Sequence, residues 1–266
     1  MPFKIGISTL CALNSPLNRL AEIMSRKPNS LWEFVDDGIH FLNSEEKLLF
    51  VKRLASDLSI ELSMHAPYAA VNIAATNPVS RKHSWDLTLM CIDHARRLDC
   101  KYIVFHSGLK DAFTFIFKDL DEPKYESILF LARVGDECEK YGITPLLENS
   151  ASPRAIILTP DDFLSFFEIS SSFKMALDIP HAMLRGYFEQ YLNRLSHRIA
   201  YFHISDNDGK QDLHLALSRG SLDWAGALEK IGRRGLSGPL IIENLSWSDV
   251  ETSLAALADK LQLSFN

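Results

Sequence analysis

The chain has 266 residues, 47% of them hydrophobic and 23% charged, so it can bury a large core, and its length is close to the roughly 250 residues usual for an eight-fold β/α barrel. Its net charge of -6 gives no overall attraction to nucleic acid, although a local basic patch is compatible with it. With no signal-peptide pattern, no apolar stretch long enough to span a membrane, and four scattered cysteines without Cys-x-x-Cys spacing (Cys11, Cys91, Cys100, Cys138), we expect a cytoplasmic protein with buried thiols.

Apolar runs of strand length alternate with stretches of helical periodicity along the chain. The predicted strands are Phe3–Ser8, Leu31–Asp36, Glu61–His65, Tyr102–His106, Ile143–Glu148, Phe173–Asp178, Ile199–Ser205 and Pro239–Glu243. The predicted helices are Leu17–Ser25, Glu45–Leu58, Arg81–Leu98, Pro123–Tyr141, Pro160–Ile169, Leu184–His197, Trp224–Arg234 and Ser248–Leu261. Eight βα units without a linker predict a single TIM-barrel domain, a (β/α)8 barrel over residues 1–266. The long loops at 67–80, 107–122 and 206–221 follow strands and should lie over its mouth.

Apolar runs in six of the predicted strands end at a residue that can ligate a metal. These residues are His65, His106, Glu148, Asp178, His203 and Glu243. In parallel barrels the chemistry lies at the C-terminal ends of the strands, so the six side chains should converge there. Burying several unpaired ionisable groups together costs several kcal/mol unless a positive charge compensates them. The pattern therefore predicts a metal site at the barrel mouth.

Two short spacings add ligands to this site. Asp178 and His181 are separated by two residues after the sixth strand, and Asp212 and His214 by one residue in the loop after the seventh. Each pair combines a carboxylate with an imidazole, the mixed set that suits zinc, manganese, iron or cobalt better than magnesium. We expect one to three divalent ions.

At these residues the sequence resembles the xylose-isomerase-like barrel superfamily, which contains sugar phosphate isomerases and epimerases together with the endonuclease IV group of apurinic-site nucleases. The matching stretches are His65-Ala66-Pro67-Tyr68, Phe105-His106-Ser107-Gly108, Leu147-Glu148-Asn149, Leu177-Asp178-Ile179-Pro180-His181, His203-Ile204-Ser205-Asp206-Asn207-Asp208-Gly209, Asp212-Leu213-His214 and Ile242-Glu243-Asn244. The resemblance implies that Glu148, Asp178, His203 and Glu243 ligate a metal in both branches. His65, His106, His181, Asp212 and His214 complete a nine-residue set similar to the three-metal site of the nuclease branch.

The favoured interpretation is an isomerase or epimerase of a small carbohydrate or other hydroxy-carbonyl compound. A metal would chelate the carbonyl and its neighbouring hydroxyl and stabilise an enediolate, while Glu148 and Glu243 exchange the proton as base and acid. Their simpler role is ligation alone. His181 would contact a substrate hydroxyl or hold a second metal, and Arg219 is a candidate for binding a terminal phosphate or carboxylate.

The alternative is a phosphodiester hydrolase that acts on abasic DNA, with three metals activating water and binding the phosphate. Tyr68 and Asn72 after His65 resemble the nuclease pattern. Against it, the loop from Thr9 to Pro16 carries no lysine or arginine that would hold bent DNA, and Leu213 stands where the nuclease pattern has an arginine.

A third interpretation is a non-catalytic metal-binding or sugar-binding barrel, which would bind its ligand without turnover. Nucleic acid is a partner only under the second interpretation, and no membrane partner is expected. An apolar helix face would be compatible with a homodimer, which a single sequence does not test.

Overall fold

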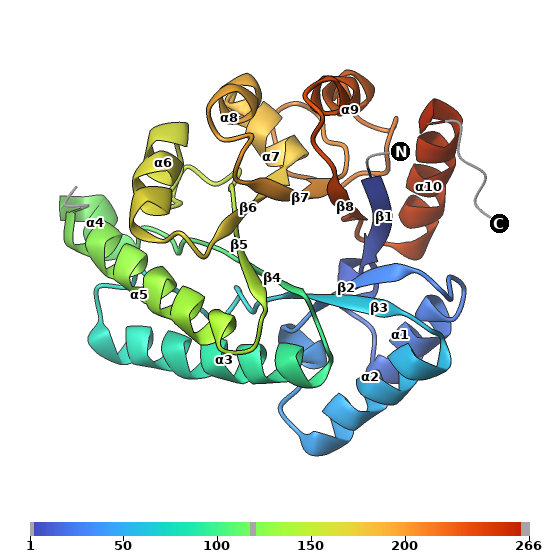
Figure 1. The fold of residues 1–266 in the computed structure, drawn as a ribbon, viewed down its shortest axis with the longest axis horizontal. Helices are drawn as coiled ribbons and strands as arrows, with labels where there is room; N and C mark the ends of the chain where they lie inside the picture. Colours follow the sequence, from blue (N-terminus) through green and yellow to red (C-terminus); the bar gives the residue numbers. More distant parts are fainter. Residues whose placement is uncertain (1–2, 118–120, 262–266) are drawn as a thin grey trace.

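The computed structural model describes residues 3–117 and 121–261, and its centre is a closed barrel of parallel strands in the order β1 to β8. The strands are β1 (Phe3–Ser8), β2 (Leu31–Val35), β3 (Glu61–His65), β4 (Tyr102–Phe105), β5 (Thr144–Glu148), β6 (Lys174–Asp178), β7 (Ile199–Ile204) and β8 (Gly238–Ile242). The barrel closes where β1 pairs with β8, from Phe3 beside Gly238 to Ile7 beside Ile242. The predicted (β/α)8 fold is confirmed (Figure 1).

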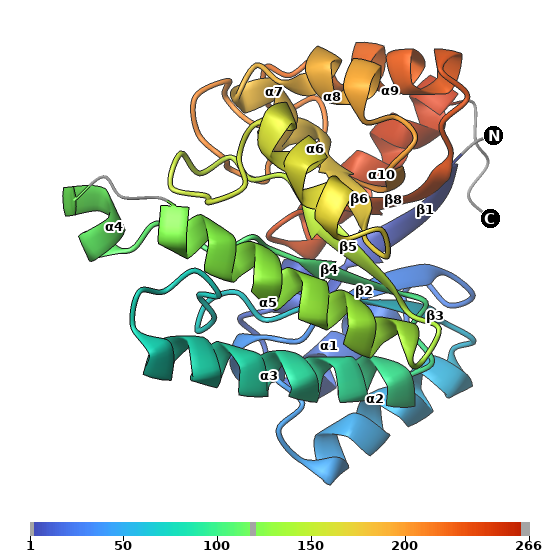
Figure 2. The ribbon, with the colours of Figure 1, turned by 60° about the vertical axis from the view of Figure 1, so that its left-hand side comes forward.

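The helices surround the strands, as Figures 1 and 2 show from two directions. They are α1 (Leu17–Met24), α2 (Glu45–Asp57), α3 (Pro78–Arg97), α4 (Ala112–Phe117), α5 (Asp121–Glu139), α6 (Pro160–Ile169), α7 (Ile179–Leu184), α8 (Phe188–Arg194), α9 (Trp224–Arg233) and α10 (Trp247–Leu261). Short 3-10 helices follow β1 and β2, at Thr9–Ala12 (η1) and Gly38–His40 (η2). The segment predicted as a long loop at 107–122 contains α4, which stands beyond the end of α5 in Figure 2.

The helix predicted over Leu184–His197 is confirmed only in part, because α8 covers Phe188–Arg194 and a separate short helix, α7, precedes it at Ile179–Leu184. The first, α7, begins directly after β6, where the Asp178 carboxylate accepts a 2.6 Å hydrogen bond from the His181 amide. Pro180 in the first turn favours this start, since proline fits the N-terminal positions of a helix. Gly186, at φ +71°, ends α7 in the left-handed conformation that glycine adopts at low cost.

The core has an outer and an inner part. The larger outer cluster joins strands to helices and contains residues such as Phe34, Phe105 and Phe166. The inner cluster consists of Leu31, Val104, Leu146, Ala176, Tyr201 and Ile241, each from a different strand. These six side chains fill the barrel interior below the strand ends, so the mouth has a packed floor.

The four cysteines are free and buried, which agrees with their expected role as packed thiols. Within residues 3–117 and 121–261, no helix combines the length and the hydrophobicity that a membrane crossing requires.

We predict that Leu146→Ala lowers the free energy of unfolding by about 2–5 kcal/mol, because Leu146 is fully buried in the barrel floor and truncation leaves a cavity. Val79→Ala is the control, since Val79 is 74% exposed and its truncation should change stability by less than about 0.5 kcal/mol. Urea unfolding of both variants at the same metal concentration measures the difference. Similar losses in the two variants would show that the floor is not tightly packed.

Candidate metal centre and active site

A polar layer lies directly above the barrel floor, because successive side chains of a strand alternate between two faces. Each residue of the inner cluster is followed two positions later by an ionisable side chain. The pairs are Leu31 and Glu33, Val104 and His106, Leu146 and Glu148, Ala176 and Asp178, Tyr201 and His203, and Ile241 and Glu243. Strand geometry therefore places all six ionisable side chains on the inner face. Their convergence follows from the pleat of the sheet.

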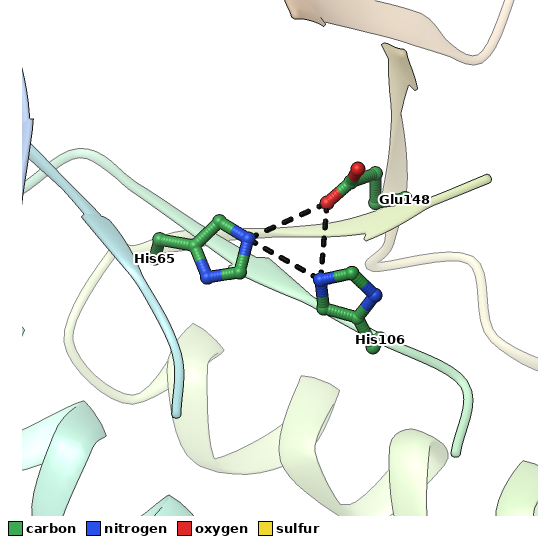
Figure 3. A group of neighbouring side chains, drawn as sticks. All are labelled: His65, His106 and Glu148. Carbon is green, nitrogen blue, oxygen red and sulfur yellow. Dashed lines mark hydrogen bonds and ion pairs between the residues drawn. The ribbon is translucent and has the colours of Figure 1, made fainter. Parts of the chain in front are cut away.

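The first group of potential ligands consists of His65, His106 and Glu148 (Figure 3). The Glu148 Oε2 atom lies 3.4 Å from His65 Nε2 and 3.3 Å from His106 Nε2, and the two histidine nitrogens are 3.3 Å apart. The three side chains come from β5, the end of β3 and the residue after β4. Two imidazole nitrogens and a carboxylate oxygen thus surround one point, as in a zinc-type site.

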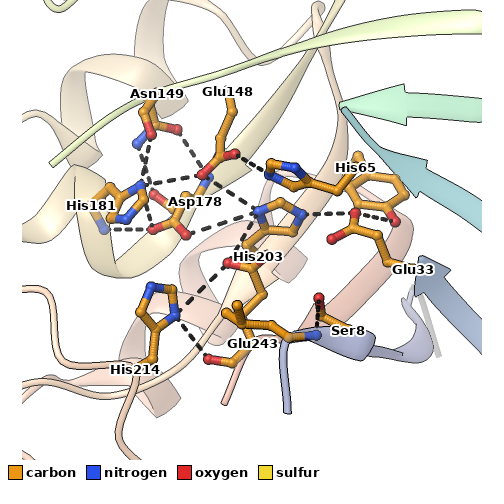
Figure 4. A network of polar contacts seen from close by, with 12 residues as sticks. Ser8, Glu33, His65, Glu148, Asn149, Asp178, His181, His203, His214 and Glu243 are labelled. Carbon is orange, nitrogen blue, oxygen red and sulfur yellow. Dashed lines mark hydrogen bonds and ion pairs between the residues drawn. The ribbon is translucent and has the colours of Figure 1, made fainter. Parts of the chain in front are cut away.

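The second group surrounds the Nδ1 atom of His203 and is almost completely buried (Figure 4). This atom lies 3.6 Å from Glu148 Oε1, 3.6 Å from Glu243 Oε2 and 4.0 Å from Asp178 Oδ2. Because the two oxygens of Glu148 face different groups, this carboxylate would contribute one potential ligand atom to each group.

The third group consists of His181, Asp212 and His214, at the more exposed side of the centre. The Asp212 Oδ2 atom lies 2.8 Å from His181 Nε2 and 3.4 Å from His214 Nε2. His181 is held by α7, whereas Asp212 and His214 belong to the loop after β7. All nine residues predicted as ligands are therefore brought together in three groups, and Glu148 belongs to two of them.

Four of the five imidazoles in these groups are oriented by a hydrogen bond. In each, one ring nitrogen faces the other potential ligands, and the opposite ring nitrogen donates the hydrogen bond. Nδ1–H of His65 donates to the Ala66 carbonyl at 2.9 Å, that of His181 to the Asn149 carbonyl at 2.9 Å, and that of His214 to the Glu243 carbonyl at 3.0 Å. In these three rings Nε2 is left for ligation. Such a bond fixes the ring and its tautomer, which is the usual support of a metal-binding histidine.

The fourth oriented ring is His203, whose partner, Glu33, was not identified from the sequence. His203 Nε2–H donates to Glu33 Oε2 at 3.1 Å, and the same oxygen accepts a 2.9 Å bond from the Tyr201 hydroxyl, which also contacts Ser63 at 2.7 Å. Glu33 is fully buried in the middle of β2. Its signal in the sequence is the carboxylate two residues after Leu31, on the same face as the other site residues.

The mutual distances of these charged groups shift their pKa values in opposite directions. Burial raises the pKa of Glu148, but the imidazoles of His106 and His203 outweigh it and hold this pKa well below its usual range. Burial raises the pKa of Glu243 and that of Asp178, the latter to about 7. Burial lowers the pKa of His203, yet Glu243, Glu33 and Glu148 together raise it well above its usual value. Without a cation, protons must therefore balance the buried carboxylates.

The residues present fit a divalent metal. Glu148 Oε2 and His203 Nδ1 are buried and lack a hydrogen-bond partner, which is costly for polar atoms that a cation does not engage. Both atoms point into the groups described above. The mixture of imidazole nitrogen and carboxylate oxygen favours zinc, manganese, iron or cobalt over magnesium.

A cavity of about 580 Å³ opens onto this centre, within the size range of small-molecule sites. Tyr68 lines it, with its ring centre 5.7 Å from that of His65 and 5.4 Å from that of His106. Asn72 instead braces two loops, because its side chain pairs with both the amide and the carbonyl of Leu109. Arg219 is exposed and is not among the residues that line the cavity, so the structure does not support a substrate-binding role for it.

Comparison with known proteins identifies related chains. The family model described as xylose isomerase-like TIM barrel matches residues 30–261, which confirms the resemblance seen in the motifs. The uncharacterised protein MJ1311 of Methanocaldococcus jannaschii is 26% identical, over 99% of this chain and 91% of its own length. A probable endonuclease 4 of Thermoplasma volcanium is 24% identical over 70% of this chain and 66% of its own. The crystal structure of a D-tagatose 3-epimerase-like protein superposes with a TM-score of 0.86 at 28% identity, covering 98% of this chain and 97% of that one.

We predict that Glu33→Gln lowers the affinity for a divalent metal by about 10- to 100-fold, because it removes the carboxylate that orients and polarises His203. Glu61→Gln is the matched control, since Glu61 pairs with Lys4 at the partly exposed start of β3, at the end of the strand opposite His65. Competition with a chromophoric chelator measures both affinities. Equal affinity in the two variants would mean that Glu33 has only a structural role.

Metal binding should release protons. Burial lowers the pKa of His65 and of His214, but the adjacent Glu148 and Asp212 outweigh it and raise both values to about 9. These imidazoles are protonated below that pH, and a metal must displace their protons. We therefore expect the affinity to rise with pH from about 7, the pKa of Asp178, to about 9. Calorimetry in buffers of different ionisation enthalpy counts the protons, and an affinity that does not change over this range would contradict the assignment.

Proposed function

Since the chain belongs to the xylose isomerase-like TIM barrel family, we propose that it is a divalent-metal-dependent epimerase or isomerase of a small sugar or related hydroxy-carbonyl compound. The observation that carries the proposal is the placement of Glu148 and Glu243, each 3.6 Å from His203 Nδ1 and each lining the same cavity of small-molecule size. The resemblance to a D-tagatose 3-epimerase-like protein supports the same class of reaction.

Glu148, Asp178, His203 and Glu243 would hold the principal metal ion. When bound, this ion would supply a Lewis acid that polarises the substrate's carbonyl and neighbouring hydroxyl oxygens. Asp178 is fixed for this role, because its backbone amide donates to Asn149 Oδ1 at 2.9 Å and its backbone carbonyl accepts from Asn149 Nδ2 at 2.9 Å.

Glu148 and Glu243 have environments that suit opposite roles in proton transfer. The low pKa of Glu148 keeps it ionised, whereas the raised pKa of Glu243 favours its acid form. In the proposed reaction Glu148 removes the proton from the carbon next to the carbonyl, and the electron pair of that C–H bond moves into the enediolate. Glu243 then returns a proton, on the opposite face for epimerisation. His181 would position a substrate hydroxyl from the side of α7.

A second candidate is a metal-dependent phosphodiester hydrolase acting on abasic DNA. The observation in its favour is the division of nine ligands into three groups, which is sufficient for three ions. The weak similarity to a probable endonuclease 4 agrees with it. Against it, the loop after β1 folds into η1 and presents only Leu10 to the cavity, without a cation for a bent DNA backbone.

We predict that the metal-loaded protein, incubated with its hydroxy-carbonyl substrate in D₂O, incorporates deuterium at the carbon next to the carbonyl. Glu243→Gln should reduce this exchange by at least about 100-fold, the usual contribution of general acid–base catalysis. Glu251→Gln, on the exposed face of α10, should not change it. Mass spectrometry measures the exchange, and metal content is compared in all three proteins.

An abasic DNA duplex should remain uncut by the same metal-loaded protein. If the duplex is cleaved efficiently and no sugar or sugar phosphate undergoes exchange, the second candidate replaces the first.

A further inference from the structure

Arg185 is a cation in the cavity wall, and its side chain has no hydrogen-bonding or ion-pairing partner among residues 3–117 and 121–261. It lines the cavity, and its Nε atom is buried without a hydrogen bond. None of the ion pairs among the described residues includes it, whereas Arg194, in the neighbouring helix α8, pairs with Asp161 at 2.5 Å. A partly buried guanidinium normally engages an anion, since its five N–H donors lose hydration on burial.

The position of Arg185 is set by α7. It caps the C-terminus of this helix and follows His181 by four residues, so the two residues lie on the same face about 6 Å apart along the axis. Its amide donates to the His181 carbonyl at 3.1 Å, which fixes that spacing. The helix that carries His181 into the metal centre therefore also carries a cation one turn farther out.

Lys210 adds a second cation to the same wall. It lies two residues before Asp212 in the loop after β7, lines the same cavity and is exposed. None of the ion pairs among the described residues includes it. Arg185 and Lys210 both line the cavity that also contains His181 and Asp212, which are joined by a 2.8 Å hydrogen bond. Apart from Tyr68, the remaining ionisable residues of the cavity wall are the carboxylates and imidazoles of the candidate metal centre.

We propose that Arg185, assisted by Lys210, binds an anionic end group, a phosphate or a carboxylate, of an open-chain substrate. The opposite, hydroxy-carbonyl end of that substrate would lie between Glu148 and Glu243. This placement of the hydroxy-carbonyl end rests on the proposed function. A planar guanidinium binds either oxyanion with paired hydrogen bonds. The substrate class is therefore an acidic sugar derivative, and Arg185 is the residue that distinguishes it from a neutral sugar.

The test is equilibrium binding, which requires no turnover. Calorimetry on the metal-loaded protein compares a neutral ketohexose, its 6-phosphate and a keto-acid of similar length. We expect at least one of the two anions to bind about 10- to 100-fold more tightly than the neutral sugar, the range for hydrogen bonds to a charged group. Whichever anion gains affinity identifies the end group. Arg185→Gln should remove most of this preference, Lys210→Gln part of it, and Arg185→Lys should retain part.

Arg219→Gln is the matched control, because Arg219 is exposed outside the cavity and its loss should leave the preference unchanged. The proposal is overturned if the wild type binds all three ligands equally, or if Arg185→Gln with full metal content keeps the preference, since the anion would then bind the metal directly. Anion preference without deuterium exchange on any ligand would refute the proposed function and leave the subsite standing. Exchange on neutral ketoses without anion preference would refute the subsite alone.

Discussion

The burial of carboxylates and imidazoles side by side at one end of the barrel is the constraint on which the rest of the site depends. Glu33, Glu148, Asp178 and Glu243 have side chains almost without solvent contact, as do His65, His181 and His203. Removing one ionised group from water costs several kcal/mol, so these groups coexist only if each faces an opposite charge, a proton or a cation. The raised pKa of Asp178 and the lowered pKa of Glu148 express this competition. A divalent metal would balance the charge of the buried carboxylates, because one ion carries the charge that neutralises two of them.

The pleat of the strands allows such a charged layer to sit on a stable fold. Leu146 closes the barrel interior, and Glu148, two residues later, reaches the metal centre on the same face. Tyr201 joins the two layers, since its ring belongs to the floor while its hydroxyl donates to Glu33. The hydrophobic layer thus supports the polar one directly, and a displaced floor residue would move a ligand.

The helices and loops at the mouth give the site its individual character. α7 is only six residues long, yet it places His181 in the third ligand group and Arg185 farther out in the same cavity. The loop after β7 adds Asp212 and His214 from the opposite side, and Lys210 beside them. The floor and the principal ligand group suit either proposed chemistry. The shape and charge of these outer segments would therefore decide which of the two proposed substrates binds.

The sequence by itself determined the barrel and most of its candidate site. Continuous apolar runs that end in His65, Glu148 or Asp178 are typical of buried parallel strands, and a closed parallel barrel has only one end at which such residues meet. The helix starting at Ile179 was also encoded, since Asp178 and Pro180 form a strong start signal, but the helical periodicity after Leu184 obscured it. A helix predicted from that periodicity alone therefore begins after His181.

Only the tertiary structure decided which side chains act together. Glu33 lies in the middle of an apolar strand. Its contact with His203 joins residues 170 positions apart, so no local sequence pattern reveals this contact. The same holds for the division of nine potential ligands into three groups, and for the finding that Arg185, and not Arg219, lines the cavity. Sequence periodicity specifies the face of an element on which a residue lies. The distance between two faces depends on barrel closure and strand register, which arise from the packing of the whole chain.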